Sequence, residues 1–414
     1  MTDGTQPATE TAATNGSDLP EDLMELAVAF LGGVDDPYPY YARLRTEAPR
    51  FRIPEGPSVL TRRADVASVL RDPRMGLMYV EKQKQMWGEE LWEASRLLQS
   101  KQNWMFFKDP PEHTRMRGLL KSVFSPETMA GMAPTIERLV DERLDMVLEM
   151  GEFDMVNDFS HHITVDSIGE LFGVPYEGRH HFSDWAVLFD AVPGLDTWDR
   201  AEELVAQYED YFGELVPHKR ENPGDDLISR LLAVEQDGDR LTLDEVVVLS
   251  FSVFGAGFDT TQHAIGNAVH SLLQNPDQLQ LLRDEPGLMR NAIDELLRYD
   301  GSVMFTERTA LEPLDLDDEH YDRGHTFYFG LGAANRDPEA FERPDDLDLR
   351  REKPQPLTLG GGIHFCIGAA LGRLEMQIAL TKVLERAPKL ELAGDPRWKK
   401  SVVIRGLEAL PVSA

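Results

Sequence analysis

LGGGIHFCIG (residues 359–368) contains the only cysteine in this 414-residue chain, and a helical pattern follows it directly. A lone thiol cannot form a disulfide within the chain, and no companion Cys or His stands at zinc spacing. A thiolate is a strong metal ligand, and glycines allow a backbone to approach a flat, bulky partner. One axial thiolate on an iron porphyrin is the chemistry that needs a single sulfur. The alternative is an inert, buried Cys366 on a glycine-rich turn.

This stretch resembles the haem-binding loop of the cytochrome P450 family, F-G-x-G-x-H-x-C-x-G. The matching residues are Gly360, Gly362, His364, Cys366 and Gly368. The resemblance implies that Cys366 is the axial ligand of the iron of haem b. The departure is Leu359, where the family usually has a Phe that packs beside the sulfur. We therefore expect the shielding of the thiolate, and the reduction potential of the iron, to differ from the family pattern.

An acid and an alcohol interrupt an otherwise apolar helical segment in AGFDTT, residues 256–261. Burying a carboxylate is costly unless it is paired or serves a purpose. A carboxylate beside a hydroxyl can relay protons through water to an oxygen-activating site. The alternative is a threonine bonded back to its own helix, with the acid facing solvent. The stretch resembles the family's oxygen-groove motif, A-G-x-D/E-T-T, which implies that Asp259 and Thr260 are catalytic. Gly255 and Gly257 would leave room for a ligand against the helix.

Glu295 and Arg298 stand three residues apart on one helix face, a spacing that also occurs elsewhere in the chain. Their helix resembles the family's structural Glu–Arg helix, which stabilises the fold around the haem. The family completes the pair with an Arg in a following loop, where this chain has Asp346. Arg343 and Arg350 are both candidates for the third member, and the sequence leaves the choice open.

Positively charged side chains are needed to bury the two propionates of a haem. His113 and Arg117 stand at i and i+4 after a Pro pair, and Arg308 precedes a β-like run. Each alone is typical of a surface charge. Together with His364 they match the positions that bind propionates in the family. The resemblance extends over about residues 105–385, and the order and spacing of the motifs agree with soluble prokaryotic members.

Substrate contacts are expected, on the family pattern, at Phe254, Ala256, Val303, Met304 and Phe305. Ordinary core positions are the alternative for these residues. Their character, with the Met- and Trp-rich stretch 75–92, indicates an apolar or mixed small molecule of terpenoid, steroid, fatty acid or polyketide type.

The rest of the chain reads as one mostly helical domain, residues 19–414, after a disordered tail over 1–18. Helices are predicted over 134–150, 199–220, 241–274, 286–300 and 368–387, and HTFYFGL (325–331) is the clearest strand. The fold class is therefore mostly α with a minor β region. The resemblance implies a triangular prism, with the haem between the long central helix and the cysteine loop.

The composition limits the partners. The chain has 73 acidic and 42 basic residues, a formal net charge of −31, which argues against nucleic acid and anionic membranes as partners. No apolar run approaches the roughly 18 to 20 residues that cross a bilayer. A single Cys fits a reducing compartment, so we expect a cytoplasmic protein.

The resemblance implies a monooxygenase that uses O2 and two electrons to hydroxylate or epoxidise its substrate. No flavin fingerprint is present, so we expect the electrons to come from a separate carrier, and the resemblance implies a ferredoxin with its reductase. Such carriers are acidic, and Arg115, Lys121 and Arg373 are candidates for a locally basic face. The alternative is a haem protein without catalysis: an electron carrier, a sensor or a partner-recruiting scaffold. A carrier needs no proton relay, so the acid–alcohol pair counts against the first of these.

Overall fold

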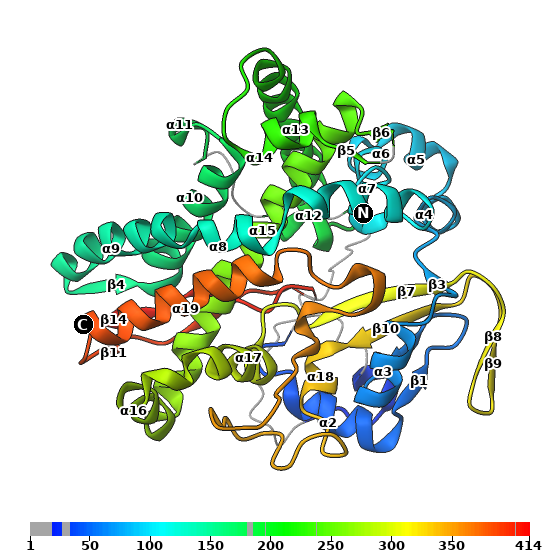
Figure 1. Ribbon diagram of the computed structural model, residues 1–414. Helices are drawn as coiled ribbons and strands as arrows, with labels where there is room; N and C mark the ends of the chain where they lie inside the picture. Colours follow the sequence, from blue (N-terminus) through cyan, green and yellow to red (C-terminus); the bar gives the residue numbers. More distant parts are fainter. Residues whose placement is uncertain (1–18, 27–33, 180–184, 195, 237, 402) are drawn as a thin grey trace, which may run out of the picture.

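The computed structural model describes residues 19–26, 34–179, 185–194, 196–236, 238–401 and 403–414. The predicted tail over 1–18 lies outside the described residues. Helices make up most of the molecule, and the β-strands gather mainly on one side (Figure 1). The predicted fold class, mostly α with a minor β region, is confirmed.

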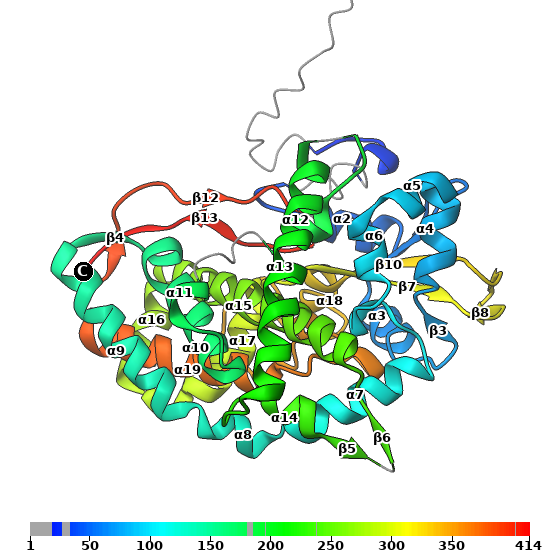
Figure 2. The same ribbon diagram turned by 90° about the horizontal axis from the view of Figure 1, so that it is seen from above.

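Helix α15 (Leu243–Gln274) runs through the interior and organises the fold. It begins with a capping box: Glu245 N–H donates to Thr242 Oγ1 at 3.2 Å, and Thr242 N–H donates to Glu245 Oε2 at 2.8 Å. Because the helix is apolar nearly all round, it is enclosed by neighbours (Figures 1 and 2). These neighbours are α10 (His161–Phe172), α13 (Asp196–Glu221), α17 (Met289–Asp300) and α19 (Ala369–Arg386).

The predicted helices agree with the observed ones to within a few residues. Residues 134–150 form most of α9 (Ala133–Met150), and the predicted helix over 286–300 begins with a 3-10 turn before α17. The other α-helices are α2 (Tyr38–Glu47), α3 (Arg63–Val69), α4 (Tyr79–Trp87), α5 (Glu89–Ala94), α6 (Arg96–Lys101), α7 (Glu112–Val123), α8 (Pro126–Gly131), α11 (Tyr176–Arg179), α12 (Val187–Asp190), α14 (Leu227–Ala233), α16 (Pro276–Asp284) and α18 (Leu331–Asn335). Short 3-10 turns are η1 (Met105–Phe107), η3 (Pro286–Leu288), η4 (Leu357–Leu359) and η5 (Gly362–His364), and η2 (Met155–Ser160) is a π-helical turn.

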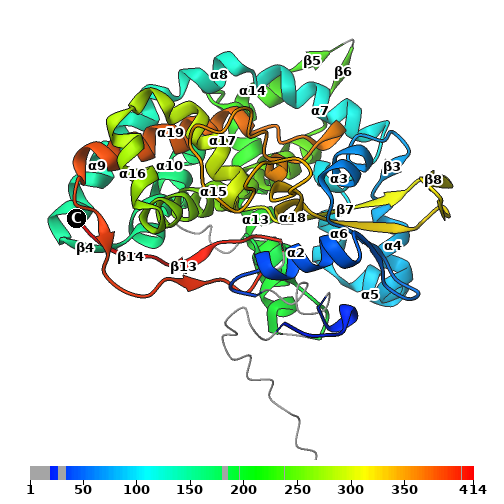
Figure 3. The same cartoon turned by 90° about the horizontal axis from the view of Figure 1, so that it is seen from below.

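The main sheet has five strands in the order β1-β2-β10-β7-β3. Their bounds are β1 (Arg50–Arg52), β2 (Ser58–Leu60), β3 (Met75–Gly76), β7 (Phe305–Ala310) and β10 (Thr326–Gly330). The strand predicted over 325–331 is β10, which pairs parallel with β2 and antiparallel with β7. The sheet lies at the side of the helical body, next to α3 (Figures 1 and 3). Its strand β7 reaches toward the centre of the molecule and carries Arg308 there.

The other strands form smaller β units. They are β4 (Glu152–Asp154) with β14 (Pro411–Ser413) and β11 (Glu391–Leu392), β12 (Arg397–Trp398) with β13 (Leu407–Ala409), β5 (Glu235–Gln236) with β6 (Asp239–Arg240), and β8 (Leu314–Leu316) with β9 (Glu319–Tyr321). Strand β13 lies against α15 and η2. No helix in the described ranges is long and apolar enough to span a bilayer.

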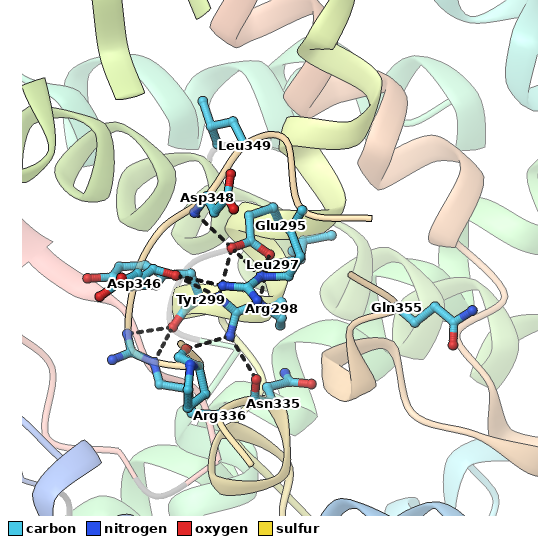
Figure 4. Close-up of polar contacts among 12 residues, drawn as sticks. Glu295, Leu297, Arg298, Tyr299, Asn335, Arg336, Asp346, Asp348, Leu349 and Gln355 are labelled. Carbon is cyan, nitrogen blue, oxygen red and sulfur yellow. Dashed lines mark hydrogen bonds and ion pairs between the residues drawn. The ribbon is translucent and has the colours of Figure 1, made fainter. Parts of the chain in front are cut away.

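Glu295 and Arg298 form a fully buried ion pair on α17 (Figure 4). Both nitrogen–oxygen distances are 2.7 Å, from Arg298 Nε to Glu295 Oε2 and from Nη2 to Oε1. The same guanidinium donates to the backbone carbonyls of Asn335 (2.9 Å), Pro344 (2.8 Å) and Asp346 (3.1 Å). The pair therefore ties the irregular chain before the cysteine loop to α17.

The third member of this network is Arg351, whose Nε lies 3.1 Å from both carboxylate oxygens of Glu295. Neither candidate named from the sequence reaches Glu295. Arg343, with a left-handed φ of 47°, pairs with carboxylates of its own loop, and Arg350 pairs with Glu285. The side chain of Arg351 is only 9% exposed.

Candidate active site

A cavity of about 320 Å³ lies between α15, α19, the cysteine loop and β7. It brings together motifs that are far apart in the sequence. Its lining includes Cys366, Thr260 and Gly257, the hydrogen-bond donors His113, Arg117, Arg308 and His364, the loop residues Leu359, Gly360 and Gly368, and the apolar Met105, Phe106, Val253, Ala256, Val303 and Leu331.

The cysteine loop takes its shape from two glycines with left-handed backbone. Gly360 has φ +72° and Gly362 has φ +63°, conformations that residues with a side chain rarely adopt. A Cβ on Gly362 would lie 2.1 Å from the carbonyl oxygen of Leu70, so the loop also packs too tightly against α3 for any side chain. The backbone N–H of Cys366 donates to Leu359 O at 2.9 Å. These contacts fix the Cys366 thiol at the start of α19.

Cys366 lies in the wall that separates the inner cavity from an outer depression, and it lines both. Burial raises the pKa of its thiol, while the backbone N–H of Gly368 and the charges of Arg117 and Arg373 oppose that rise. A thiol in this environment becomes a thiolate when a metal cation binds it.

Four donor side chains face the cavity opposite α15. The rings of His113 and His364 lie 4.2 Å apart, and neither ring nitrogen of His113 has a hydrogen-bond partner in the described protein. Burial and the nearby Arg117 and Arg308 lower the pKa of His113 to about 4. Burial lowers the pKa of Arg308 to about 10, and the Arg308 guanidinium donates only to the backbone carbonyl of Glu307 among the described residues.

This donor set fits a haem. Within the described ranges, neither buried Arg308 nor half-buried Arg117 forms an ion pair with a carboxylate, and a buried cation without an anion is costly. The two carboxylates of a haem would satisfy Arg117, Arg308, His113 and His364. Its iron would take the Cys366 sulfur, and the glycines leave room for the ring.

Helix α15 presents one face to the cavity, at Val253, Ala256, Gly257, Thr260, Thr261 and Ala264. The Thr260 hydroxyl donates to Ala256 O at 2.9 Å. Asp259 is 1% exposed and points away from the cavity; its Oδ1 lies 3.6 Å from His263 Nε2. Burial raises the pKa of Asp259, but His263, Lys399 and His161 outweigh it and leave the pKa below its usual value. The acid is therefore a carboxylate held behind the helix, one residue from a hydroxyl that faces the cavity.

The structure separates the five expected substrate contacts. Ala256 and Val303 line the cavity. Phe254, one residue past Val253 and so about 100° around the helix, packs on Phe172, Phe212 and Phe258 instead. Met304 and Phe305 face the opposite side and pack with Tyr41 and Val59. Strand alternation explains why Thr306 and Arg308, rather than Phe305, reach the cavity.

Gly255 serves a different purpose from the one predicted. A Cβ on Gly255 would lie 2.1 Å from the ring of Trp185, so this glycine admits an aromatic side chain and not a ligand. Gly257 does line the cavity, with Ile168 2.8 Å from where its Cβ would be.

Glu375 is a cavity residue that the sequence reasoning missed. It is 1% exposed on α19, and the Ser167 hydroxyl donates to its Oε1. Burial raises the pKa of Glu375 to about 8, and the bond from Ser167 opposes this. An acid on the buried side of the helix predicted over 368–387 was the available signal.

The outer depression, on the far side of Cys366, encloses about 1350 Å³. The charged residues of its lining, here called its rim, include Lys121, Arg290, Arg373 and Asp294, and Arg373 pairs with Asp294 at 2.7 Å. Ile363 and Phe365, also in the lining, are 43% and 42% exposed. Arg115, which we expected on this face, instead pairs with Glu245 and Asp239. It follows Thr114 on α7 and therefore points around the helix, away from the depression.

The comparisons with known proteins agree with this geometry. The family model described as Cytochrome P450 matches residues 77–388. Cytochrome P450 107B1 of Saccharopolyspora erythraea is 40% identical over 401 residues, covering 94% of this chain and 97% of that protein. Vitamin D(3) 25-hydroxylase of Pseudonocardia autotrophica is 36% identical over 389 residues, covering 91% and 94%. The crystal structure of P450BioI, in complex with acyl carrier protein ligated with hexadec-9Z-enoic acid, has a TM-score of 0.85 and 32% identity, covering 93% and 99%.

Proposed function

Because the chain belongs to the cytochrome P450 family of haem-dependent monooxygenases, we propose that it hydroxylates or epoxidises a large apolar small molecule, with electrons from a separate ferredoxin. The observation that carries the proposal is the inner cavity itself. It joins a single thiol, two arginines and two histidines that have no carboxylate partner in the described protein, and a hydroxyl next to a buried acid.

Each group of residues has a distinct task in this proposal. The Cys366 thiolate holds the iron, and His113, Arg117, Arg308 and His364 hold the propionates. Haem, when bound, supplies the activation of O2 and the transfer of one oxygen atom to the substrate. Asp259 supplies protons that pass by way of the Thr260 hydroxyl to the cavity side of α15.

The substrate side of the cavity is apolar. Met105, Phe106, Val253, Val303 and Leu331 contribute no charge, so the part of the substrate near the reacting carbon is expected to be hydrocarbon. Two similar proteins support this class: one is named for hydroxylation of vitamin D3, and one was crystallised with hexadec-9Z-enoic acid on its carrier protein. Polyketides, acyl chains, steroids and terpenoids all offer such a hydrocarbon face.

The test is a screen of apolar compounds of these four classes against the haem-loaded protein, scored by the change in the haem absorption spectrum. Hits are then turned over with isotopically labelled O2 and a surrogate ferredoxin and reductase. One labelled oxygen atom in the product is the expected result. Hits that bind but yield no oxygenated product, with electrons consumed only to reduce O2, would contradict the proposal.

The outer depression suits an acidic electron carrier. Lys121 and Arg290 are exposed on its rim, and neither has a carboxylate partner within the described ranges. Exposed apolar side chains beside unpaired cations in one depression suit a transient protein interface. On a chain of net charge −31 this is a local exception that would attract an acidic ferredoxin to the side of Cys366.

Lys121→Glu and Arg290→Glu should therefore each slow reduction by ferredoxin several-fold, with the effect shrinking at high salt. Arg323→Glu, an exposed site beyond β9, is the matched control and should leave the rate unchanged. Equal rates in all three variants would refute this docking face.

A further inference from the structure

A buried ammonium group lies among the aromatic side chains next to the inner cavity. Lys101, the last residue of α6, is 8% exposed, and its Nζ lies 5.9 Å from the ring centre of Phe107 and 5.7 Å from that of Phe189. Phe189 belongs to α12, which lies next to α6 (Figure 2). Met105 and Phe106, which directly precede Phe107, line the cavity. The amine therefore packs on the same turn, η1, that forms part of the cavity wall.

This amine has no carboxylate partner in the described protein. Asp190 on α12, Glu202 on α13 and Glu307 on β7 act on it from a distance, but none of the three forms an ion pair with it. Glu307 pairs with Lys82, and Glu202 accepts from the Ser95 hydroxyl. The faces of two aromatic rings take the place of an anion, and they compensate only part of the hydration that a buried cation loses.

A second polar group in the same aromatic cluster also lacks a partner. Tyr79, on α4, is 6% exposed, and its ring lies 4.7 Å from the ring of Phe107. Its hydroxyl is buried and has no hydrogen-bond partner in the described part of the chain. Because buried polar groups in folded proteins are nearly always hydrogen-bonded, two unsatisfied donors beside one ring indicate a place for an acceptor that the protein does not supply.

We propose that Lys101 anchors the anionic end of the substrate, so that the substrate is an apolar molecule with a carboxylate remote from the carbon that is oxidised. This inference rests on the proposed function and narrows its substrate class. The cavity wall at Met105 and Phe106 is uncharged and would face the hydrocarbon part, while the carboxylate would pair with the amine. A charge pair is stronger where the cation is already removed from water. Acyl chains and other carboxylic acids meet this requirement, whereas neutral steroids and terpenes do not.

The charge of the amine sets the pH range of this pairing. Burial lowers the pKa of Lys101 to about 8, while the charges of Asp190, Glu307 and Glu202 oppose that change. The amine therefore remains largely protonated at pH 7 and loses its charge as the pH rises above 8, whereas a carboxylic acid is ionised throughout this range. A preference for acids should be full near pH 7 and should weaken toward about pH 9.5.

The test compares carboxylic acids with their methyl esters, which have the same chain and no charge. Decanoic, dodecanoic, tetradecanoic and hexadec-9Z-enoic acids and their esters are titrated into the haem-loaded protein, and binding is measured by calorimetry and by the haem spectrum. At pH 7, at least one acid should bind about tenfold or more tightly than its ester. Lys101→Met keeps an apolar side chain of similar length and should abolish this preference without weakening ester binding. No binding of any acid, equal affinities of acid and ester throughout the series, or an unchanged preference in Lys101→Met overturns the anchor.

Lys84→Met is the matched control. Lys84 also lies over an aromatic ring, 5.7 Å from the centre of Trp92, but it pairs with Glu89 at 2.6 Å. Its replacement should leave the preference for acids unchanged, and a loss equal to that in Lys101→Met would overturn the anchor. Turnover with labelled O2 separates this inference from the proposed function. Oxygenation of esters and acids at equal affinity refutes only the anchor, whereas acids that bind through Lys101 and yield no oxygenated product refute only the proposed function.

Discussion

The buried acid Glu375 gives the sharpest quantitative prediction. Its side chain is 1% exposed, Ser167 donates to its Oε1, and its Oε2 has no partner among the described residues. Burial raises its pKa from 4.5 to about 8. The folded protein therefore keeps this acid neutral up to about pH 8, while the unfolded chain ionises it above pH 4.5. The free energy of unfolding must fall as the pH rises between these values, by about 1.4 kcal/mol per pH unit and about 5 kcal/mol in all.

Glu375→Gln replaces the neutral acid by an amide of the same shape. The amide oxygen can accept from Ser167, and the NH2 group takes the place of the protonated Oε2. The variant has nothing to ionise, so its advantage over the wild type should grow by about 3 kcal/mol between pH 5.5 and pH 8 and then level off. For a chain of 414 residues this corresponds to about 3 °C in thermal midpoint.

The assay is thermal unfolding of the haem-loaded protein, followed by circular dichroism at half-unit steps of pH. Glu385→Gln is the matched control, because Glu385 is exposed on the same helix. Its midpoint should stay within about 1 °C of the wild type at all pH values. If the curves for Glu375→Gln and the wild type run parallel, Glu375 is already ionised in the folded protein and the reasoning from burial is wrong.

Three further predictions test the packing around the site. Leu359→Phe should shift the reduction potential of the haem iron, because Leu359 lines the cavity and its carbonyl accepts from the Cys366 N–H. A potentiometric titration measures this shift, and an unchanged potential would mean that Leu359 serves packing alone. Arg351→Leu should cost about 3 kcal/mol in chemical denaturation by stripping a partner from fully buried Glu295, whereas Arg350→Leu, at an exposed ion pair, should cost less than about 1 kcal/mol. Equal costs would refute the assignment of Arg351. Val253→Phe should weaken spectral binding of the larger hits at least tenfold, while Phe254→Ala should cost about 3 to 5 kcal/mol and leave the ranking of hits unchanged; the reverse pattern would exchange their roles.

The local motifs could be predicted because they depend on short stretches of chain. The glycines around Cys366 and the capping box at Thr242 act within a few residues, and the long apolar run of α15 leaves few places for it except the interior. Of the five expected substrate contacts, only Ala256 and Val303 line the cavity, because the other three side chains lie on different faces of their elements. Helical spacing from Thr260 selects Val253 and Ala256 and excludes Phe254, so that correction was available in the sequence.

The remaining residues depend on packing that no local pattern encodes. Arg298 donates to the carbonyls of Pro344 and Asp346, and these bonds fix the loop that leads to Arg351. The fixed loop determines that Arg351, and not a neighbouring arginine, reaches Glu295. Glu375 is buried because α10 brings Ser167 against α19. His263 is enclosed because the backbone at Gly406, just before β13, closes over it from more than a hundred residues later in the chain. Each of these partners comes from another element.

The distribution of positive charge indicates that the inner cavity and the outer depression serve one function. An acidic chain normally pairs its cations with its many carboxylates, and most arginines here do so. The exceptions in the described protein include Arg117 and Arg308 in the inner cavity and Lys121 and Arg290 on the outer rim. Unpaired cations in the inner cavity require an anionic ligand, and unpaired cations in the outer depression favour an acidic protein partner. Cys366 lies between the two sets, so a ligand held on one side and a carrier docked on the other would meet at its sulfur.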